Sequence, residues 1–111
     1  MIFPKENDYG NTEYKQKFNA HSYIRLQKYI TQMNFRLNEG NGSAIYIVGV
    51  SDHGEVIGLT SKQISDTKNL INYMANSLNS YIKLILNCHN NNKQFLIFKI
   101  ESLNFEKLLI F

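Results

Sequence analysis

The chain has 111 residues, a length that suits one domain and one hydrophobic core without covalent cross-links. Its single cysteine, Cys88, excludes an internal disulfide and is consistent with a reducing compartment, so we expect a cytoplasmic protein. The net charge of +3 is compatible with RNA contact but does not require it. Residues 1–6, Met-Ile-Phe-Pro-Lys-Glu, do not form the apolar core of a signal peptide, and no apolar run reaches the length of a membrane-spanning helix, so we expect no membrane association.

The N-terminal region shows no helical periodicity. Residues 1–11 contain proline, asparagine and glycine without a repeating apolar pattern, and we expect a loose lead-in. Residues 12–18 then alternate, with Tyr14 and Phe18 on one side and lysines on the other, which predicts a half-buried edge strand. Lysines on such a strand discourage edge-to-edge pairing.

A first helix is predicted up to about Asn38. Its apolar residues recur at helical spacing: Leu26, Tyr29, Ile30, Met33 and Leu37. Asn19 or Ser22 can cap its first turn, and Gly40 is expected to end it in the left-handed conformation that glycine enters without steric cost. Three cations fall off the apolar stripe and are expected to be solvated: Arg25, Lys28 and Arg36.

Residues 44–50 form a continuous apolar run, which is typical of a strand covered on both faces. Residues 51–54, Ser-Asp-His-Gly, are turn formers, and residues 55–59 are predicted to return as another strand. Glycine within a strand often marks a close approach of backbone or helix. We therefore treat the following residues as one structural motif: Gly40, Gly42, Gly49, Asp52, Gly54 and Gly58.

A second helix and a hairpin complete the pattern. Thr60 opens the helix, and Gln63 three residues later predicts a capping box. Residues 81–86 and 95–100 are rich in β-formers, and the asparagines at 90–92 tolerate the left-handed turn conformation, so a hairpin is expected.

The element order β-α-β-β-α-β-β predicts an α/β fold of the α+β two-layer type, with two helices packed on one face of a mixed sheet. We place this single domain at residues 12–101. Residues 102–111 end in an apolar run and are expected to form a docked strand or the start of a connection to a following domain.

An ordered set of residues in the first half of the chain resembles a known family. The matching positions are Tyr14-Lys15, Thr31-Gln32-Met33, Arg36 to Gly42, Ala44-Ile45-Tyr46, Gly49-Val50, Asp52, Gly54 and Gly58-Leu59. They are similar to the region just before the GTPase domain in the GTP-binding protein one and two family, translational GTPases similar to elongation factor one alpha. Asn34-Phe35 departs from the family's usual Lys-Trp pair, and Ser43 replaces an acidic residue. A shorter similarity links residues 45–59 to Schlafen or AlbA-like domains.

The first resemblance implies a non-catalytic N-terminal domain that positions a translational GTPase on tRNA or the ribosome. GTP and magnesium would then belong to a downstream domain, and this chain would hold no cofactor. The alternative is a free-standing Alba-like or Schlafen-like module that binds nucleic acid or a protein. A reading frame that continues past Phe111 into Gly-x-x-x-x-Gly-Lys-Ser/Thr would favour the first, and a stop codon the second.

No constellation of catalytic or metal-binding residues is apparent. Residues 39–43, Glu-Gly-Asn-Gly-Ser, are glycine-rich, but they leave a helix and enter a strand, and no phosphate-binding lysine follows. Adjacent strand residues point to opposite faces, which disfavours Cys88 and His89 as a thiolate and its base. The three histidines lack metal-ligand spacing, so we expect no catalytic, cofactor or metal site.

The candidate RNA or partner contact is a group that we call the cationic set: Lys15, Lys17, Arg25, Lys28 and Arg36. Tyr14, Tyr23 and Tyr29 are interleaved with it and offer rings for base stacking, while the cations would contact phosphates. Because the first strand and helix are consecutive, we expect their outward side chains to form one surface. The alternative is an ordinary solvated face with the tyrosines in the core.

Overall fold

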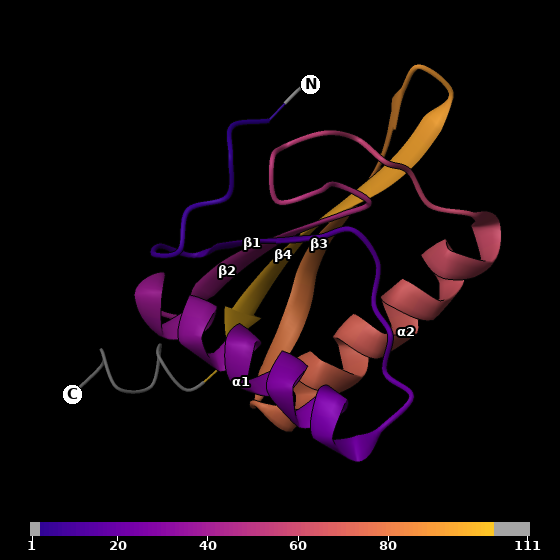
Figure 1. Ribbon diagram of the computed structural model, residues 1–111. Helices are drawn as coiled ribbons and strands as arrows, with labels where there is room; N and C mark the ends of the chain where they lie inside the picture. Colours follow the sequence, from indigo (N-terminus) through magenta and orange to yellow (C-terminus); the bar gives the residue numbers. More distant parts are fainter. Residues whose placement is uncertain (1–2, 104–111) are drawn as a thin grey trace.

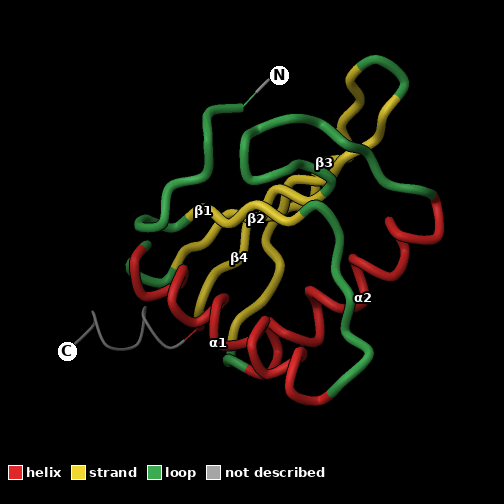
Figure 2. Tube along the Cα trace, in the orientation of Figure 1, coloured by secondary structure: helices red, strands yellow, loops and turns green. Residues whose placement is uncertain are grey.

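A computed structural model of the chain describes residues 3–103 (Figure 1). Their elements, in chain order, are β1 (Thr12–Lys15), α1 (Tyr23–Glu39), β2 (Ser43–Val48), α2 (Ser61–Ser77), β3 (Ser80–Asn90) and β4 (Lys93–Ser102). Figure 2 shows the two helices against one face of the sheet, which confirms the expected two-layer α+β class. Neither helix in this part of the chain is long and apolar enough to cross a membrane.

The sheet is mixed, and its strands lie in the order β1-β2-β4-β3. β1 pairs with β2 in parallel, whereas β4 is antiparallel to both of its neighbours. The last described strand along the chain therefore lies between β2 and β3. β3 stands at one edge of the sheet and carries a register irregularity between Ile82 and Leu84.

Both helices begin at the caps that the sequence predicts. Ser22 Oγ accepts a hydrogen bond from the amide of Arg25 at 3.1 Å. At α2, Thr60 Oγ1 accepts from the amide of Gln63 at 3.1 Å, and Gln63 Oε1 accepts from the amide of Thr60 at 2.8 Å. These reciprocal bonds satisfy amides that have no partner inside the helix, so the capping box is confirmed.

The end of α1 differs from the expectation. Gly40 has φ −98°, so it does not take the left-handed conformation; Asn41, with φ 53°, takes it instead. Glycine is still required at position 40, because a Cβ there would collide with the carbonyl oxygen of Ser43. The close backbone approach expected at this connector is therefore present, but the cap geometry is shifted by one residue.

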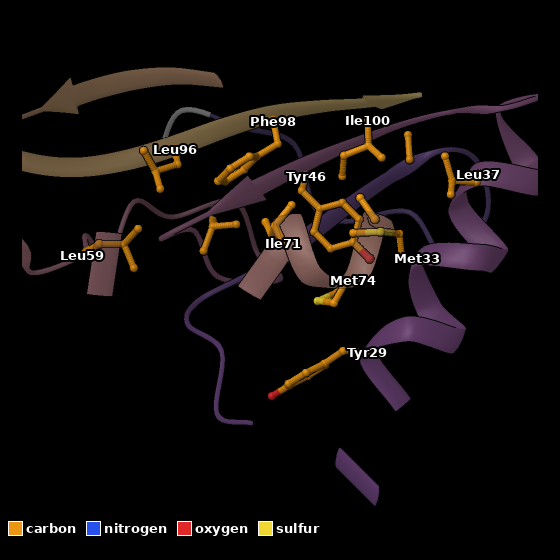
Figure 3. Close-up of a cluster of buried hydrophobic side chains, with 13 residues drawn as sticks. Tyr29, Met33, Leu37, Tyr46, Leu59, Ile71, Met74, Leu96, Phe98 and Ile100 are labelled. Carbon is orange, nitrogen blue, oxygen red and sulfur yellow. The ribbon is translucent and has the colours of Figure 1, made fainter. Parts of the chain in front are cut away.

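The main core lies between the helices and the sheet (Figure 3). β2 and β4 supply alternating residues to it: Ala44, Tyr46, Val48, Leu96, Phe98 and Ile100. The helices cover them with Tyr29, Met33, Leu37, Ile71, Met74 and Ala75. Full burial of a large apolar side chain stabilises the fold by about 1.5–3 kcal/mol, so this layer carries most of the stability.

A smaller cluster covers the other face of the sheet. Its buried members are Tyr14, Ile47, Val50 and Phe95. Because β2 contributes to both clusters, its expected coverage on two faces is confirmed. The expectation that Tyr14 and Phe18 share a side was wrong: β1 ends at Lys15, and Phe18 then packs against the main core.

Residues 3–11 form a segment that we call the N-terminal strap. The amide of Phe3 donates to the carbonyl of Gly54, and the amide of Glu6 donates to that of Asp52 at 2.8 Å. The Tyr14 hydroxyl donates to the carbonyl of Pro4 at 2.9 Å. The expectation of a loose lead-in was therefore wrong for residues 3–11.

Residues 55–59 do not form the second strand that was expected, and the element order is β-α-β-α-β-β. Among the described residues, their strand-type pairing is limited to an isolated bridge between Val50 and Val56. The amides of Ile57 and Gly58 both donate to the carbonyl of Gly49, at 2.8 and 3.0 Å. Because both amides donate to the same carbonyl, the segment closes a loop and does not form the regular hydrogen-bond ladder of a strand. The turn at residues 51–54 is confirmed, with φ 91° at Gly54.

The β3–β4 hairpin is confirmed and is longer than predicted. Asn91 and Asn92 take positive φ values of 49° and 67°, as the turn chemistry requires. The docked strand or connection expected at residues 102–111 lies, beyond Leu103, outside the described residues.

Candidate nucleic-acid interface

Arg36 is buried, with a relative exposure of 4%, so the expectation that it is solvated was wrong. Its Nε donates to Glu13 Oε1 at 2.9 Å. Nη1 donates to the carbonyl of Gly10 at 2.8 Å, and Nη2 donates to that of Asn7 at 3.0 Å. The Glu6 carboxylate lies 3.7 Å from Nη2. Arg36 thus binds β1 and the N-terminal strap to α1.

The carboxylates around Arg36 occupy different environments. Burial raises the pKa of Glu6 above its usual value, and repulsion from Glu13 and Asp52 adds to this. The amide of Tyr14, which donates to Glu6 Oε2 at 2.6 Å, and the charge of Arg36 act in the opposite direction but do not overcome burial. The network is therefore a structural clamp in which burial disfavours the charged form of one carboxylate, Glu6.

Lys15 lies between a carboxylate and an aromatic ring. Its Nζ is 3.7 Å from Glu13 Oε2 and 5.1 Å from the centroid of the Tyr29 ring. The side chain is 18% exposed. Part of its charge is already balanced within the fold, so it can contribute only partly to an external contact.

Tyr29 organises the connector between β1 and α1. Its hydroxyl accepts from the amide of Asn19 at 3.0 Å and donates to the carbonyl of the same residue at 3.3 Å. Its ring and that of Phe18 pack edge to face, with 5.0 Å between the centroids. Lys17 and His21, on the same connector, line a pocket of about 260 Å³ against Asp66 and other residues of α2.

The outer face of the N-terminal half of α1 is open to solvent. Tyr23 and Ile24 are 75% and 74% exposed. Arg25 and Lys28 line a shallow hollow beside Ile24 and Tyr29, and Lys28 also lines a second hollow with Tyr23. We call Tyr23, Ile24, Arg25 and Lys28 together the α1 surface.

The structure therefore divides the cationic set. Lys15, Arg25 and Lys28 lie around Tyr29, Lys17 lines the pocket beside α2, and Arg36 is inside the protein. Of the three interleaved tyrosines, Tyr23 is exposed, whereas Tyr14 and Tyr29 belong to the core. Sequence reasoning missed Ile24, although its place one residue after Tyr23 and off the apolar stripe was a usable signal.

The glycine-rich connector uses its own backbone amides. The amide of Gly42 donates to the carbonyl of Leu37 at 2.7 Å, and that of Ser43 donates to Gly40 at 3.2 Å. The amide of Gly40 donates to Arg36 at 3.0 Å. A phosphate-binding loop needs free amides directed at the ligand, and these amides are occupied. Within residues 3–103, no three or more His, Cys, Asp or Glu side chains are grouped as a metal site would require.

Comparison with known proteins gives three informative similarities. The chain is 35% identical to GTP-binding protein 2 of Mus musculus and of Homo sapiens over 82 residues, which is 74% of this chain and 14% of each relative. It is 31% identical to Uncharacterized protein R625 of Acanthamoeba polyphaga mimivirus over 87 residues, which is 78% of this chain and 47% of that protein. No family model matches, and no solved structure matches. The chain is thus related in sequence to a part of a GTP-binding protein, and the similarity to Schlafen or AlbA-like domains has no support among these matches.

Proposed function

We propose that this chain is a non-catalytic domain of a translational GTP-binding protein and that the α1 surface positions that protein on tRNA or the ribosome. The observation that carries the proposal is the exposed Tyr23 beside Arg25 and Lys28 at one end of α1. The parent protein would bind and hydrolyse GTP with magnesium in a downstream domain, in the cytoplasm.

The chemistry of the α1 surface suits single-stranded or looped RNA. Arg25 and Lys28 can contact phosphates, while the ring of Tyr23 can stack on an unpaired base. The hollows beside these side chains give a base or a sugar room to approach the helix. Lys15, held over Tyr29 at the margin, extends the positive potential toward β1.

A non-catalytic role is supported by the glycine-rich connector, whose amides bond to backbone carbonyls. The similarity to a part of GTP-binding protein 2 supports a link to a GTPase. We expect calorimetry of the purified chain with GTP and magnesium to give no binding heat. Stoichiometric binding at micromolar concentration would contradict this part of the proposal.

Binding of the chain to tRNA and to ribosomes at several salt concentrations tests the contact. Affinity should fall with salt, with a log–log slope of roughly 0.7–0.9 per neutralised phosphate. The double variant Arg25→Glu with Lys28→Glu should abolish binding without unfolding the domain, because both side chains are outside the core. Glutamate in the first turn of a helix is favourable, so the exchange at Arg25 preserves α1.

The matched control is Lys62→Glu with Lys68→Glu on α2. It changes the net charge by the same amount on another helix, where Lys62 already pairs with Asp66 at 2.8 Å. If the control variant lost binding while the α1 double variant kept it, the contact would lie on α2, and the proposal would be contradicted.

A second candidate function is contact with a protein. The observation that favours it is Ile24, an aliphatic side chain 74% exposed beside a hollow of about 560 Å³. A protein contact there would be lost with Ile24→Ser and would depend little on salt, whereas an RNA contact would depend steeply on salt.

A further inference from the structure

β3 is the long strand at one edge of the sheet. It has 11 residues, and in the described part of the chain β4 is its strand partner on one side only. Figure 1 shows the end of the β3–β4 hairpin projecting past the other strands. An edge strand of this length offers a row of amides and carbonyls to another strand.

The orientation of these backbone groups follows from β4. The carbonyl of Gln94 accepts from the amide of Leu59 at 2.8 Å, so it is turned away from β3. Gln94 faces His89 across the hairpin, which makes this pair one without mutual hydrogen bonds. Because the two pair types alternate along an antiparallel ladder, Asn87 and Ile85 also direct their amides and carbonyls to the open edge.

The side chains at this point are apolar and exposed. Leu84, Ile85 and Leu86 have relative exposures of 49%, 37% and 44%. Leu86 faces Ile97, which packs with the smaller cluster on the helix-free face, and Ile85 faces Phe98 on the helix-covered face. The open edge is therefore apolar on both faces of the sheet.

Protection against edge pairing covers only the first part of β3. Lys83 lies at the register irregularity, where a bulge and a cation both discourage pairing. Its charge is balanced by Glu101 Oε1 at 3.3 Å. Residues 84–88, by contrast, carry no charge. At the opposite edge, β1 has only four residues, and Arg36 holds the N-terminal strap beside it.

We propose that β3 pairs with β3 of a second copy of this chain, antiparallel and about a two-fold axis at Ile85. In this register Ile85 faces Ile85 of the other copy, and Leu84 faces Leu86, which gathers four leucines on the helix-free face. Lys83 faces Asn87, so no like charges oppose each other. The exposed apolar residues of one copy therefore pack against those of the other, and the two sheets join into one continuous sheet.

The oligomeric state of the full chain tests the proposal. Light scattering on a sizing column should give twice the mass of the 12.9 kDa chain. Leu84→Lys with Leu86→Lys should give the mass of one chain and an unchanged circular dichroism spectrum. The control is Ile57→Lys, since Ile57 is 40% exposed but lies outside the strands. A wild-type mass of one chain at all concentrations would overturn the proposal.

A cross-link tests the register. In a Cys88→Ser background, Ile85→Cys should form an interchain disulfide on mild oxidation, because Cα atoms of a hydrogen-bonded pair lie about 5.5 Å apart. Asn87→Cys should stay reduced in the same background, since it faces Lys83. Efficient cross-linking through Asn87→Cys and none through Ile85→Cys would overturn the two-fold at Ile85. Arg25→Glu with Lys28→Glu should leave the dimer intact, since α1 packs over β2 rather than β3.

Discussion

Arg36 donates from Nε to Glu13 Oε1 at 2.9 Å across 23 residues of sequence, with side-chain exposures of 4% and 9%. The bond joins the last turns of α1 to the edge strand β1. Two further bonds from the same guanidinium hold the N-terminal strap. A residue expected to face RNA is thus the point at which three segments of the fold meet.

Replacing Arg36 by leucine should destabilise the domain strongly. The substitution removes the hydrogen-bonded cation of the buried Glu13, which among the described residues keeps only Lys15 at 3.7 Å, and leaves two carbonyls without their donors, a loss of about 3–5 kcal/mol. Urea unfolding measures the change in the free energy of unfolding. Lys28→Leu is the control on an exposed face of the same helix and should change stability by no more than about 0.5 kcal/mol. Similar stabilities for the two variants would contradict the clamp.

The pH dependence of stability should carry a contribution from Glu6. Its pKa is raised in the folded state, so the folded protein holds this proton more tightly than the unfolded chain does. The contribution to stability is then greatest at low pH and is lost as pH rises from near the ordinary value of 4.5 through the folded pKa. Glu6→Gln removes the titration. The wild type should therefore lose stability relative to Glu6→Gln across this window, and a constant difference would refute the shift.

Removing the hydroxyl of Tyr46 and removing that of Tyr29 should change the free energy of unfolding in opposite directions. The Tyr46 hydroxyl is buried and, within residues 3–103, has no hydrogen-bond partner, and burial raises its pKa. Tyr46→Phe should raise the free energy of unfolding by about 1 kcal/mol, because a buried unpaired hydroxyl has lost its hydration. Tyr29→Phe should lower it by about 1 kcal/mol, since that hydroxyl bonds to Asn19. Thermal melts of both variants measure the contrast, and equal shifts would contradict it.

Gly49 should be sensitive to a side chain for two separable reasons. Its φ is +99°, and an added Cβ would lie 3.0 Å from Cβ of Phe95 and 3.1 Å from Cγ of Leu59. Gly10 has a similar φ of +86°, but nothing lies within 4 Å of its added Cβ. Gly10→Ala therefore measures backbone strain alone, and Gly49→Ala should cost about 1–3 kcal/mol more through overpacking. Equal denaturation midpoints for the Gly10→Ala and Gly49→Ala variants would show that Gly49 is not tightly enclosed.

Signals that act over a few residues were readable in the sequence. The caps at Ser22 and Thr60 and the asparagine turn of the hairpin each depend on neighbours within about one helical turn, so their chemistry was sufficient. Arg36 was not readable, because its partners are 23 to 29 residues away and nothing local distinguishes it from the exposed Lys28. Residues 55–59 carry strand-forming side chains, but the carbonyl of Gly49 takes two of their amides and closes a loop instead. The α1 surface was partly foreseen through Arg25 and Lys28.

The position of β4 has a consequence for how the chain acquires its shape during synthesis. β4 is the last described strand to be made, yet it supplies the antiparallel neighbour of both β2 and β3. Until it emerges from the ribosome, β2 has only the four residues of β1 beside it, and β3 has no strand partner. The apolar faces of both helices stay largely uncovered over that interval, since Leu96, Phe98 and Ile100 complete the main core. A nascent chain that stops at the hairpin turn would therefore remain protease-sensitive, and nearly the whole domain can fold only after β4 has left the ribosome.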